Sequence, residues 1–138
     1  MVHALGCEYI ILDHISIVIS GLQEGDERRL LDNTMTELRK LVEELKIGMF
    51  VVSHLKRPEG KLGHEEGVQT SLSHLRGSHS LAQLSDAVLG FERNQQDSEA
   101  NNLMTVRVLK NRFSGETGVA TLLRYEKDTG RLHENNIA

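Results

Sequence analysis

The sequence has a single cysteine, Cys7, so an internal disulfide is excluded. A lone cysteine suits a reducing, intracellular setting, and we expect Cys7 to serve as a small buried hydrophobic residue. The sequence also has no apolar run near the ~20 residues that span a bilayer. Its first residues lack the basic start and long apolar stretch of a signal peptide. These absences predict a cytoplasmic protein with no membrane partner.

Basic residues are not in excess, and several familiar motifs are missing. The net charge is −4, so any contact with nucleic acid must be local. No nucleophile elbow occurs, and the spacings of His64, His74 and His79 match neither a helical zinc pair nor a Cys/His finger. We therefore expect no zinc site. The phosphate-binding motif G-x-x-x-x-G-K-[ST] is absent as well.

A short apolar run near the start of the chain ends abruptly in a carboxylate and an imidazole. The run Tyr9–Leu12 is followed by Asp13 and His14. Such a run is typical of a strand buried on both faces of a parallel sheet. Ligands bind at the carboxyl end of such strands, and an aspartate there can hold a divalent metal together with waters and substrate phosphates.

The next segment predicts a crossover helix and a second strand. The segment from Ile15 to Ile19 continues apolar and β-branched, and a helix is expected to begin near Asp26 and to end near Gly48. Its apolar residues recur at steps of four and three, at Leu31, Met35, Leu38, Val42 and Leu45. A second apolar run, Met49–Ser53, then leads to His54. This order implies a right-handed βαβ unit with Asp13 and His54 at the same sheet edge.

A stretch without periodicity, from Leu55 to Thr70, separates this unit from the last third of the chain. A structureless stretch of this length is usually functional or disordered. Its basic residues Lys56, Arg57 and Lys61 could contact nucleic-acid phosphates, or could form an ordinary solvated loop. The loop contains no aromatic residue, so it offers no base stacking of the usual kind.

The last third predicts a strand at Ala87–Phe91 and a hairpin formed by Leu103–Lys110 and Val119–Tyr125. Arg112 falls at the hairpin tip. An arginine projected from a hairpin can stabilise charge on a transferring phosphoryl group, including in a neighbouring subunit, or can be a solvated turn residue. His54, like Arg112, has a functional and an ordinary interpretation. It could sense a terminal phosphate, or it could be a half-exposed histidine without a function.

Taken together, seven segments in this order closely resemble the carboxy-terminal half of the RecA-like motor domain of DnaB-type replicative ring helicases. The resemblance runs from about Glu8 to Leu132 and is strongest to the primase-helicases of short-tailed phages. The segments that carry it are Tyr9–Ser16, Val52–Lys56, His64–Gly67, Leu75–Ser78, Gln83–Asp86, Phe91–Gln96 and Leu109–Gly118. The resemblance implies an α/β fold, part of a RecA-like P-loop NTPase core with a mixed sheet. In that fold the parallel βαβ unit is followed by a carboxy-terminal antiparallel hairpin.

The resemblance also implies roles for individual residues. Asp13 would be the Walker B aspartate that positions Mg²⁺, and His54 would contact the γ-phosphate of ATP or another NTP or dNTP. Arg112 would be the arginine finger, with Lys110 assisting. Arg93 would be a second interface arginine, and Gln83 would lie at the nucleotide. Arg76 and Gly77 would belong to a motif that couples the nucleotide to DNA. A channel loop that touches single-stranded DNA would contain Lys56, Arg57 and Lys61.

The chain departs from the family in two respects. His79 stands where the family often has a small residue, and the phosphate-binding lysine loop and catalytic glutamate, which lie upstream in the family, are absent. Residues 1–138 would thus be a single partial domain, the second half of a helicase motor that forms a ring, expected to be a hexamer, on single-stranded DNA. It would act in the cytoplasm of a phage-infected bacterium. Two alternatives stay open: another RecA-type ATPase, recombinase-like or clock-type, and a non-catalytic oligomerisation or DNA-binding module.

Overall fold

The computed structural model describes residues 6–20, 26–60, 62–76 and 79–135. The chain folds as two compact units. The first comprises Met1–Leu55 and Leu75–Ser85, and the second comprises Lys56–His74 and Asp86–Ala138. Within the described ranges, no helix is both long and apolar enough to cross a membrane.

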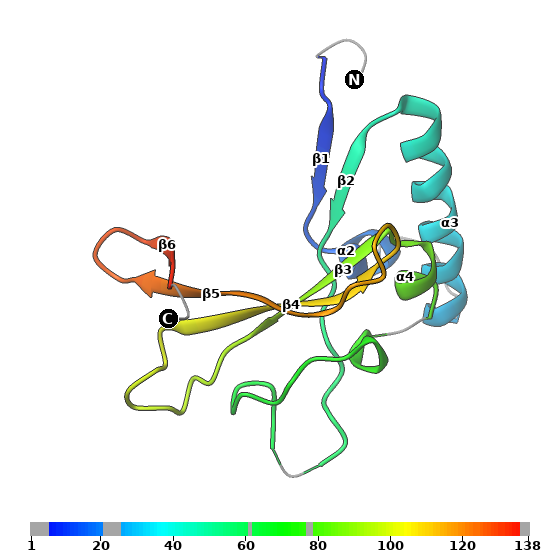
Figure 1. Ribbon diagram of the computed structural model, residues 1–138. Helices are drawn as coiled ribbons and strands as arrows, with labels where there is room; N and C mark the ends of the chain where they lie inside the picture. Colours follow the sequence, from blue (N-terminus) through cyan, green and yellow to red (C-terminus); the bar gives the residue numbers. More distant parts are fainter. Residues whose placement is uncertain (1–5, 21–25, 61, 77–78, 136–138) are drawn as a thin grey trace. The chain divides into compact units, whose positions relative to one another are not determined.

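The first unit is built around a parallel pair of strands. Strand β1 (Tyr9–Leu12) pairs with β2 (Gly48–Val51), and Leu12 lies opposite Val51. Between them come the short helix α2 (Ile15–Ser20) and the long helix α3 (Glu27–Leu45), while helix α4 (His79–Leu84) comes later in the sequence. Figure 1 shows β1 and β2 side by side, with α3 alongside them. The predicted βαβ unit is confirmed, and its two strands are direct neighbours.

Helix α3 begins and ends with identifiable caps. Asp26 is its N-cap, and the Asp26 side chain accepts a hydrogen bond from the backbone N–H of Arg28 at 3.1 Å. The expected stop near Gly48 is displaced, because the left-handed residue is Lys46, with φ 53°. The N–H of Lys46 donates to the carbonyl of Val42. Gly48 instead opens β2, where a Cβ would collide with the ring of Tyr9.

The core of the first unit lies on one side of its strands. Ile15 is 1% exposed and packs with Ile19, Leu31, Met35 and Leu81. Ile15 and Ile19 stand four residues apart, so a helix places both on the same face. This burial explains why a β-branched segment forms helix α2: packing outweighs the small cost that β-branched residues impose on a helix.

The opposite side of the two strands is open, which corrects the expectation that β1 is buried on both faces. Tyr9, Ile11 and Phe50 are 67%, 74% and 60% exposed. Side chains alternate between the faces of a strand, and the described helices α2 and α3 pack on only one of them. Cys7 is also exposed, against expectation, because it lies in the irregular segment that precedes β1.

The second unit contains a four-stranded antiparallel sheet. Its strands are β3 (Ala87–Glu92), β4 (Leu103–Asn111), β5 (Gly118–Glu126) and β6 (Arg131–Glu134), in that spatial order, and Figure 1 shows the hairpin of β4 and β5. The 3₁₀ turn η1 (Leu72–His74) belongs to the same unit. The predicted hairpin and the strand β3 are confirmed, together with the α/β fold class, whereas β6 was not predicted.

Candidate functional site

The parallel register brings the segments after β1 and β2 to one edge of the sheet. The N–H of Val52 donates to the carbonyl of Leu12 at 2.9 Å, and the N–H of Ile15 donates to the carbonyl of Val52 at 3.1 Å. Asp13, exposed, therefore lies in a turn that is tied to the start of the segment carrying His54. The predicted placement of Asp13 and His54 at one edge is confirmed. The peptide bond between Asp13 and His14 is cis.

His14 links the two segments through its side chain. The rings of His14 and His54 lie 4.2 Å apart between centroids, at 73° to each other, in an edge-to-face arrangement. The Nδ1 atom of His14 is buried and has no hydrogen-bond partner. Sequence reasoning assigned His14 no role of its own, since its only signal was the position next to Asp13. The structure thus places two imidazoles, not one, at the end of the strand pair.

His54 is also tied to the predicted coupling segment. The backbone N–H of Arg76 donates to the carbonyl of His54 at 3.3 Å, and Leu55 and Leu75 form an antiparallel bridge. The guanidinium of Arg76 is exposed and lies 3.8 Å from the carboxylate of Glu27. The backbones of His54 and Arg76 are therefore in direct contact. Gly77, predicted beside Arg76, lies outside the described residues.

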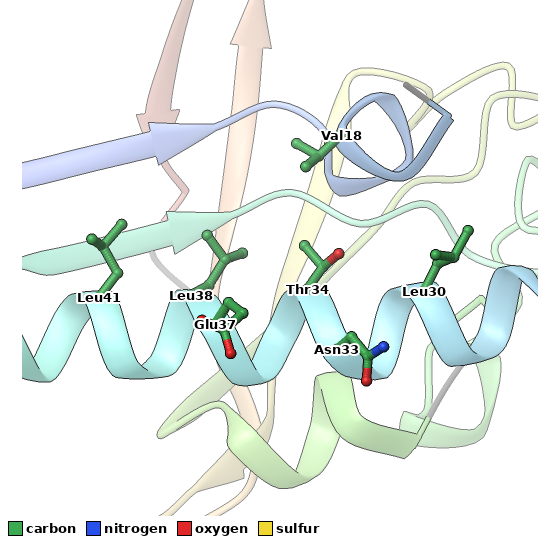
Figure 2. Close-up of a pocket in the computed structure, with 7 residues that line it drawn as sticks. All are labelled: Val18, Leu30, Asn33, Thr34, Glu37, Leu38 and Leu41. Carbon is green, nitrogen blue, oxygen red and sulfur yellow. The ribbon is translucent and has the colours of Figure 1, made fainter. Parts of the chain in front are cut away.

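Two grooves on the described part of the first unit differ in character. The larger, about 620 Å³, is lined mainly by apolar side chains of α3 together with Val18 of α2, and it contains none of the predicted site residues. Figure 2 shows Val18 facing the row of Leu30, Leu38 and Leu41 on α3. The second groove, about 460 Å³, is polar and lies between α3 and α4. Its lining residues are Arg28, Asp32, Thr36, His79, Ser80, Gln83 and Leu84.

The predicted DNA loop is ordered at its base. Lys56 and Arg57 are exposed, and the backbone N–H of Lys56 donates to the carbonyl of His74 at 2.8 Å. A turn follows, in which the N–H of Gly67 donates to the carbonyl of His64 at 3.1 Å. The expectation of a structureless stretch is therefore too simple, because local hydrogen bonds close it into turns. Lys61, the third basic residue, lies outside the described residues.

Arg112 lies in the turn that follows β4, as predicted, and is anchored there. Its Nη1 donates to Oδ1 of Asp86 at 2.7 Å, and its backbone N–H donates to the carbonyl of Asp86 at 2.8 Å. Lys110 lies on β4 opposite Val88. Asp86 ends Gln83–Asp86, one of the segments that carry the family resemblance, but the sequence assigned it no role. The structure pairs it with both the guanidinium and the backbone of Arg112.

Arg93 follows β3 and donates through Nε to the carbonyl of Asn101. The side chain of the preceding residue, Glu92, is 9% exposed and forms a bidentate pair with Arg107, at 2.7 and 3.0 Å. The N–H and hydroxyl of Thr70 each donate to Glu92 at 2.8 Å. Burial alone would raise the pKa of Glu92, but the hydrogen bonds from Arg107 and Thr70 prevail and lower it. This network anchors the end of β3, directly before Arg93.

The chemistry that these residues can perform follows from their types and places. Among the described residues, no three His, Cys, Asp or Glu side chains gather into a ready-made metal site. Asp13 fits Mg²⁺, because this ion keeps several waters and commonly takes only one or two protein carboxylates together with phosphate oxygens. Asp13, His54, Arg76 and Gln83 belong to the first unit, whereas Lys56, Arg57, Arg93, Lys110 and Arg112 belong to the second.

Solved structures share this fold. The chain superimposes with a TM-score of 0.74 on a structure described as an ATPase domain, at 22% identity over 93% of this chain and 44% of that one. A DnaB-like replicative helicase, solved with attention to its interactions with primase, gives a TM-score of 0.70 at 21% identity, over 90% of this chain and 29% of that one. The chain therefore shares the fold of these two proteins.

The chain belongs to the family described as the DnaB-like helicase C-terminal domain, whose sequence profile matches residues 1–134. It is also 46% identical, over 132 residues, to a protein described as a DNA helicase/primase of Enterobacteria phage T3. That alignment covers 96% of this chain but only 23% of the phage protein, so the chain spans about a quarter of the relative's length. The family expected from the sequence motifs is confirmed.

Proposed function

We propose that this chain is the part of an NTP-dependent replicative DNA helicase that carries the Walker B aspartate, the γ-phosphate sensor, the DNA loop and the arginine finger. The intact protein would translocate on single-stranded DNA as a ring, expected to be a hexamer, and would unwind duplex DNA. The observation that carries the proposal is the parallel pairing of β1 with β2, which brings the turn after Leu12 beside the segment leading to His54. Substrate phosphates bind at this edge in α/β folds.

At this edge, Asp13 would hold Mg²⁺, which bridges phosphate oxygens and neutralises charge during phosphoryl transfer. His54 would donate a hydrogen bond to the γ-phosphate of ATP or another NTP or dNTP. Its ring is already oriented by the edge-to-face contact with His14, so little rotamer entropy is lost when the nucleotide binds. Gln83, on the polar groove of the first unit, would respond to the same nucleotide.

Arg112 would act on the nucleotide bound by the neighbouring subunit, with Lys110 assisting and Arg93 at the same interface. The guanidinium of Arg112 is half-exposed and is held by Asp86 through Nη1, and a guanidinium carries five N–H donors in total. The bond to Asp86 would hold the guanidinium in place before it meets a phosphate. Such arginine fingers accelerate hydrolysis by about 10³-fold or more.

The DNA would be bound by Lys56, Arg57 and Lys61 of the loop, together with Arg76 and Gly77 of the coupling segment. Contacts of this kind neutralise phosphates and give salt-dependent, sequence-independent affinity. The backbone bond between Arg76 and His54 offers a short path from nucleotide to DNA. By similarity to the phage helicase/primase, the intact protein would act in the cytoplasm of the infected bacterium and alongside a primase activity.

A subunit-mixing experiment tests the proposal. In the full-length protein that contains this chain, Asp13→Asn and Arg112→Ala should each abolish DNA-stimulated NTP hydrolysis. Rings mixed from the two variants should regain part of the activity, because some interfaces then combine an intact Asp13 with an intact Arg112 from the neighbour. Rings made only of the double variant serve as the control and should stay inactive.

Other outcomes identify the alternatives. Failure of the mixed rings to regain activity would show that Arg112 does not act between subunits. Unchanged hydrolysis by Arg112→Ala would favour a non-catalytic oligomerisation or DNA-binding module. Strand exchange by the full-length protein, in place of unwinding, would favour a recombinase-like ATPase.

A further inference from the structure

The segment His64–Gly67 has no role in the proposed function, yet it lies at the base of the predicted DNA loop. The Nε2 atom of His64 lies 3.1 Å from the backbone carbonyl oxygen of Lys56. A carbonyl oxygen only accepts hydrogen bonds, so Nε2 of His64 carries the proton and donates it. The Nδ1 atom of the same ring is buried and has no hydrogen-bond partner, so the bond through Nε2 is the polar contact that holds the ring.

Lys56 is held on its other side as well. Its backbone N–H donates to the carbonyl of His74 at 2.8 Å, and the rings of His64 and His74 meet edge to face, 5.1 Å apart between centroids at 67°. The carbonyl of Lys56 is thus bonded to His64, and the N–H of Lys56 is bonded to His74. The rings of the two histidines also contact each other. We call Lys56, His64 and His74 the loop-closing cluster.

The same segment is tied to the residues that follow β3. The backbone N–H of Gln95 donates to the carbonyl of Glu65 at 2.8 Å, and Glu66 forms an antiparallel bridge with Asn94. Gly67 has φ +84°, and a Cβ at this position would come close to Asn94, so a glycine is favoured. The loop that contains His64 is therefore attached to the segment that follows β3, and the bonds from Thr70 to Glu92 attach it to β3 itself.

We propose that His64 is a positioning residue for DNA binding: it fixes the backbone of Lys56 so that the lysine side chain is presented from a closed, sheet-anchored loop. A backbone at Lys56 that is fixed before DNA arrives loses less entropy on binding. His64 itself makes no contact with DNA in this arrangement. The inference rests on the proposed role of Lys56 in binding single-stranded DNA.

Three variants of the full-length protein separate the elements of the cluster. His64→Gln keeps an N–H donor at about the position of Nε2 of His64. His64→Phe keeps a ring against His74 but has no donor. Lys56→Ala removes the proposed DNA contact. The probe is a fluorescein-labelled oligothymidine, and its affinity is measured by anisotropy over a series of salt concentrations. Hydrogen exchange of the Lys56 amide reports on the closure without DNA.

We expect His64→Phe to weaken oligothymidine binding about fivefold, the effect of one lost hydrogen bond, and His64→Gln to stay within about twofold of the unchanged protein. The slope of the logarithm of the binding constant against the logarithm of the salt concentration should stay unchanged in His64→Phe. The same slope should be smaller by about one in Lys56→Ala. The Lys56 amide should exchange about fivefold faster in His64→Phe and at the original rate in His64→Gln.

Three results would each contradict the inference, and they separate its failure from that of the proposed DNA contact. If Lys56→Ala weakens binding and His64→Phe does not, the positioning role of His64 is wrong while the proposed DNA loop stands. A reduced salt slope in His64→Phe would show that His64 contacts phosphate directly and would also overturn the inference. If Lys56→Ala binds like the unchanged protein, the proposed DNA contact fails and the inference fails with it.

Discussion

Arg112 is bonded to Asp86 both by its guanidinium, at 2.7 Å, and by its backbone N–H, at 2.8 Å. These bonds come from different parts of Arg112, so they fix both the turn that carries the arginine and the direction of its side chain. The pair joins Asp86, directly before β3, to the turn after β4, and the two positions are far apart in the sequence. A residue that must meet the phosphate of another subunit benefits from this preorganisation.

Replacing Asp86 by asparagine should therefore affect catalysis more than stability. Asp86→Asn keeps the size and the accepting oxygen but removes the charge that holds the guanidinium. We expect the NTPase rate of the full-length protein to fall about tenfold, well short of the ~10³-fold loss expected for Arg112→Ala. Because the pair is partly exposed, the free energy of unfolding should change by less than about 1 kcal/mol. Hydrolysis by Asp86→Asn at the original rate would show that Asp86 does not orient Arg112 for the reaction.

The isolated 138-residue chain should not hydrolyse NTP, because its sequence contains no G-x-x-x-x-G-K-[ST] motif to bind the phosphates. Phosphoryl transfer depends on positioning and on charge stabilisation around the γ-phosphate, and Asp13 and His54 alone supply only part of both. Phosphate release from the purified chain is measured with His54→Ala as the control. Turnover above that of the control would contradict the prediction.

Glu92 should make the stability of the chain depend on pH in the acid range. Its pKa is lowered from the ordinary 4.5, so the stability that it contributes is present above that pH and is lost as the pH falls through the lowered pKa. Glu92→Gln leaves Arg107 without its charged partner and should cost about 2 kcal/mol at pH 7. The difference between the two proteins should shrink at low pH, as measured by urea unfolding.

Glu126→Gln is the matched control for this experiment. Hydrogen bonds from Thr129 and then from His133 also lower the pKa of Glu126, but that carboxylate is exposed, so water screens its interactions. The effect of Glu126→Gln on stability should be much smaller. An equal effect of the two substitutions would show that burial of the Glu92 pair does not determine its contribution.

Gly90 should not tolerate a side chain. A Cβ at this position would collide with the hydroxyl of Thr70, which is 2% exposed and bonded to Glu92. Gly90→Ala should therefore destabilise the chain by about 2 kcal/mol. The cost of the double variant Gly90→Ala with Thr70→Ala should be less than the sum of the two single costs, because the second change removes the colliding group. If the costs of the two single variants simply add up in the double variant, the collision with the Thr70 hydroxyl is not the source of the strain.

A glycine at position 46 should stabilise the chain. Lys46 adopts φ 53°, a conformation in which a side chain costs about 1 kcal/mol and a glycine costs little. Lys46→Gly should raise the free energy of unfolding by about 0.5–1 kcal/mol in urea titrations. Lys46→Ala, which loses the same charge but keeps a Cβ, should give no gain. A gain from both would indicate that charge, and not backbone conformation, is responsible.

The sequence predicted the elements whose signals are local. The spacing from Leu31 to Leu45 predicted α3, and the order of strand, helix and strand predicted that Asp13 and His54 share an edge. The segment Ile15–Ile19 formed a helix despite its β-branched residues, because burial in the core outweighed local preference. The stop of α3 shifted to Lys46, a residue that seldom adopts a left-handed conformation and so carries no signal of its own.

Partners that are far apart in the sequence could not be predicted from it. Nothing in the local sequence pairs Asp86 with Arg112, Thr70 with Glu92, or His64 with His74, because such contacts depend on how strands and turns are arranged. The ring contact of His14 with His54 required knowing that β1 and β2 are direct neighbours. The open face of β1 could not be predicted either, since an apolar run does not say how many layers cover it.

The open face of β1 and β2 also bears on motion at the edge that carries Asp13. Each of these strands has one hydrogen-bonded neighbour and one packed face within the described residues, so few contacts oppose their separation. Local opening of this pair should require little free energy, and amides of Tyr9–Leu12 should exchange with solvent faster than that of Val106 in the middle of its sheet. A metal and a phosphate tolerate only small displacements of their ligands. Any surface that covers Tyr9, Ile11 and Phe50 would therefore steady Asp13 without touching it.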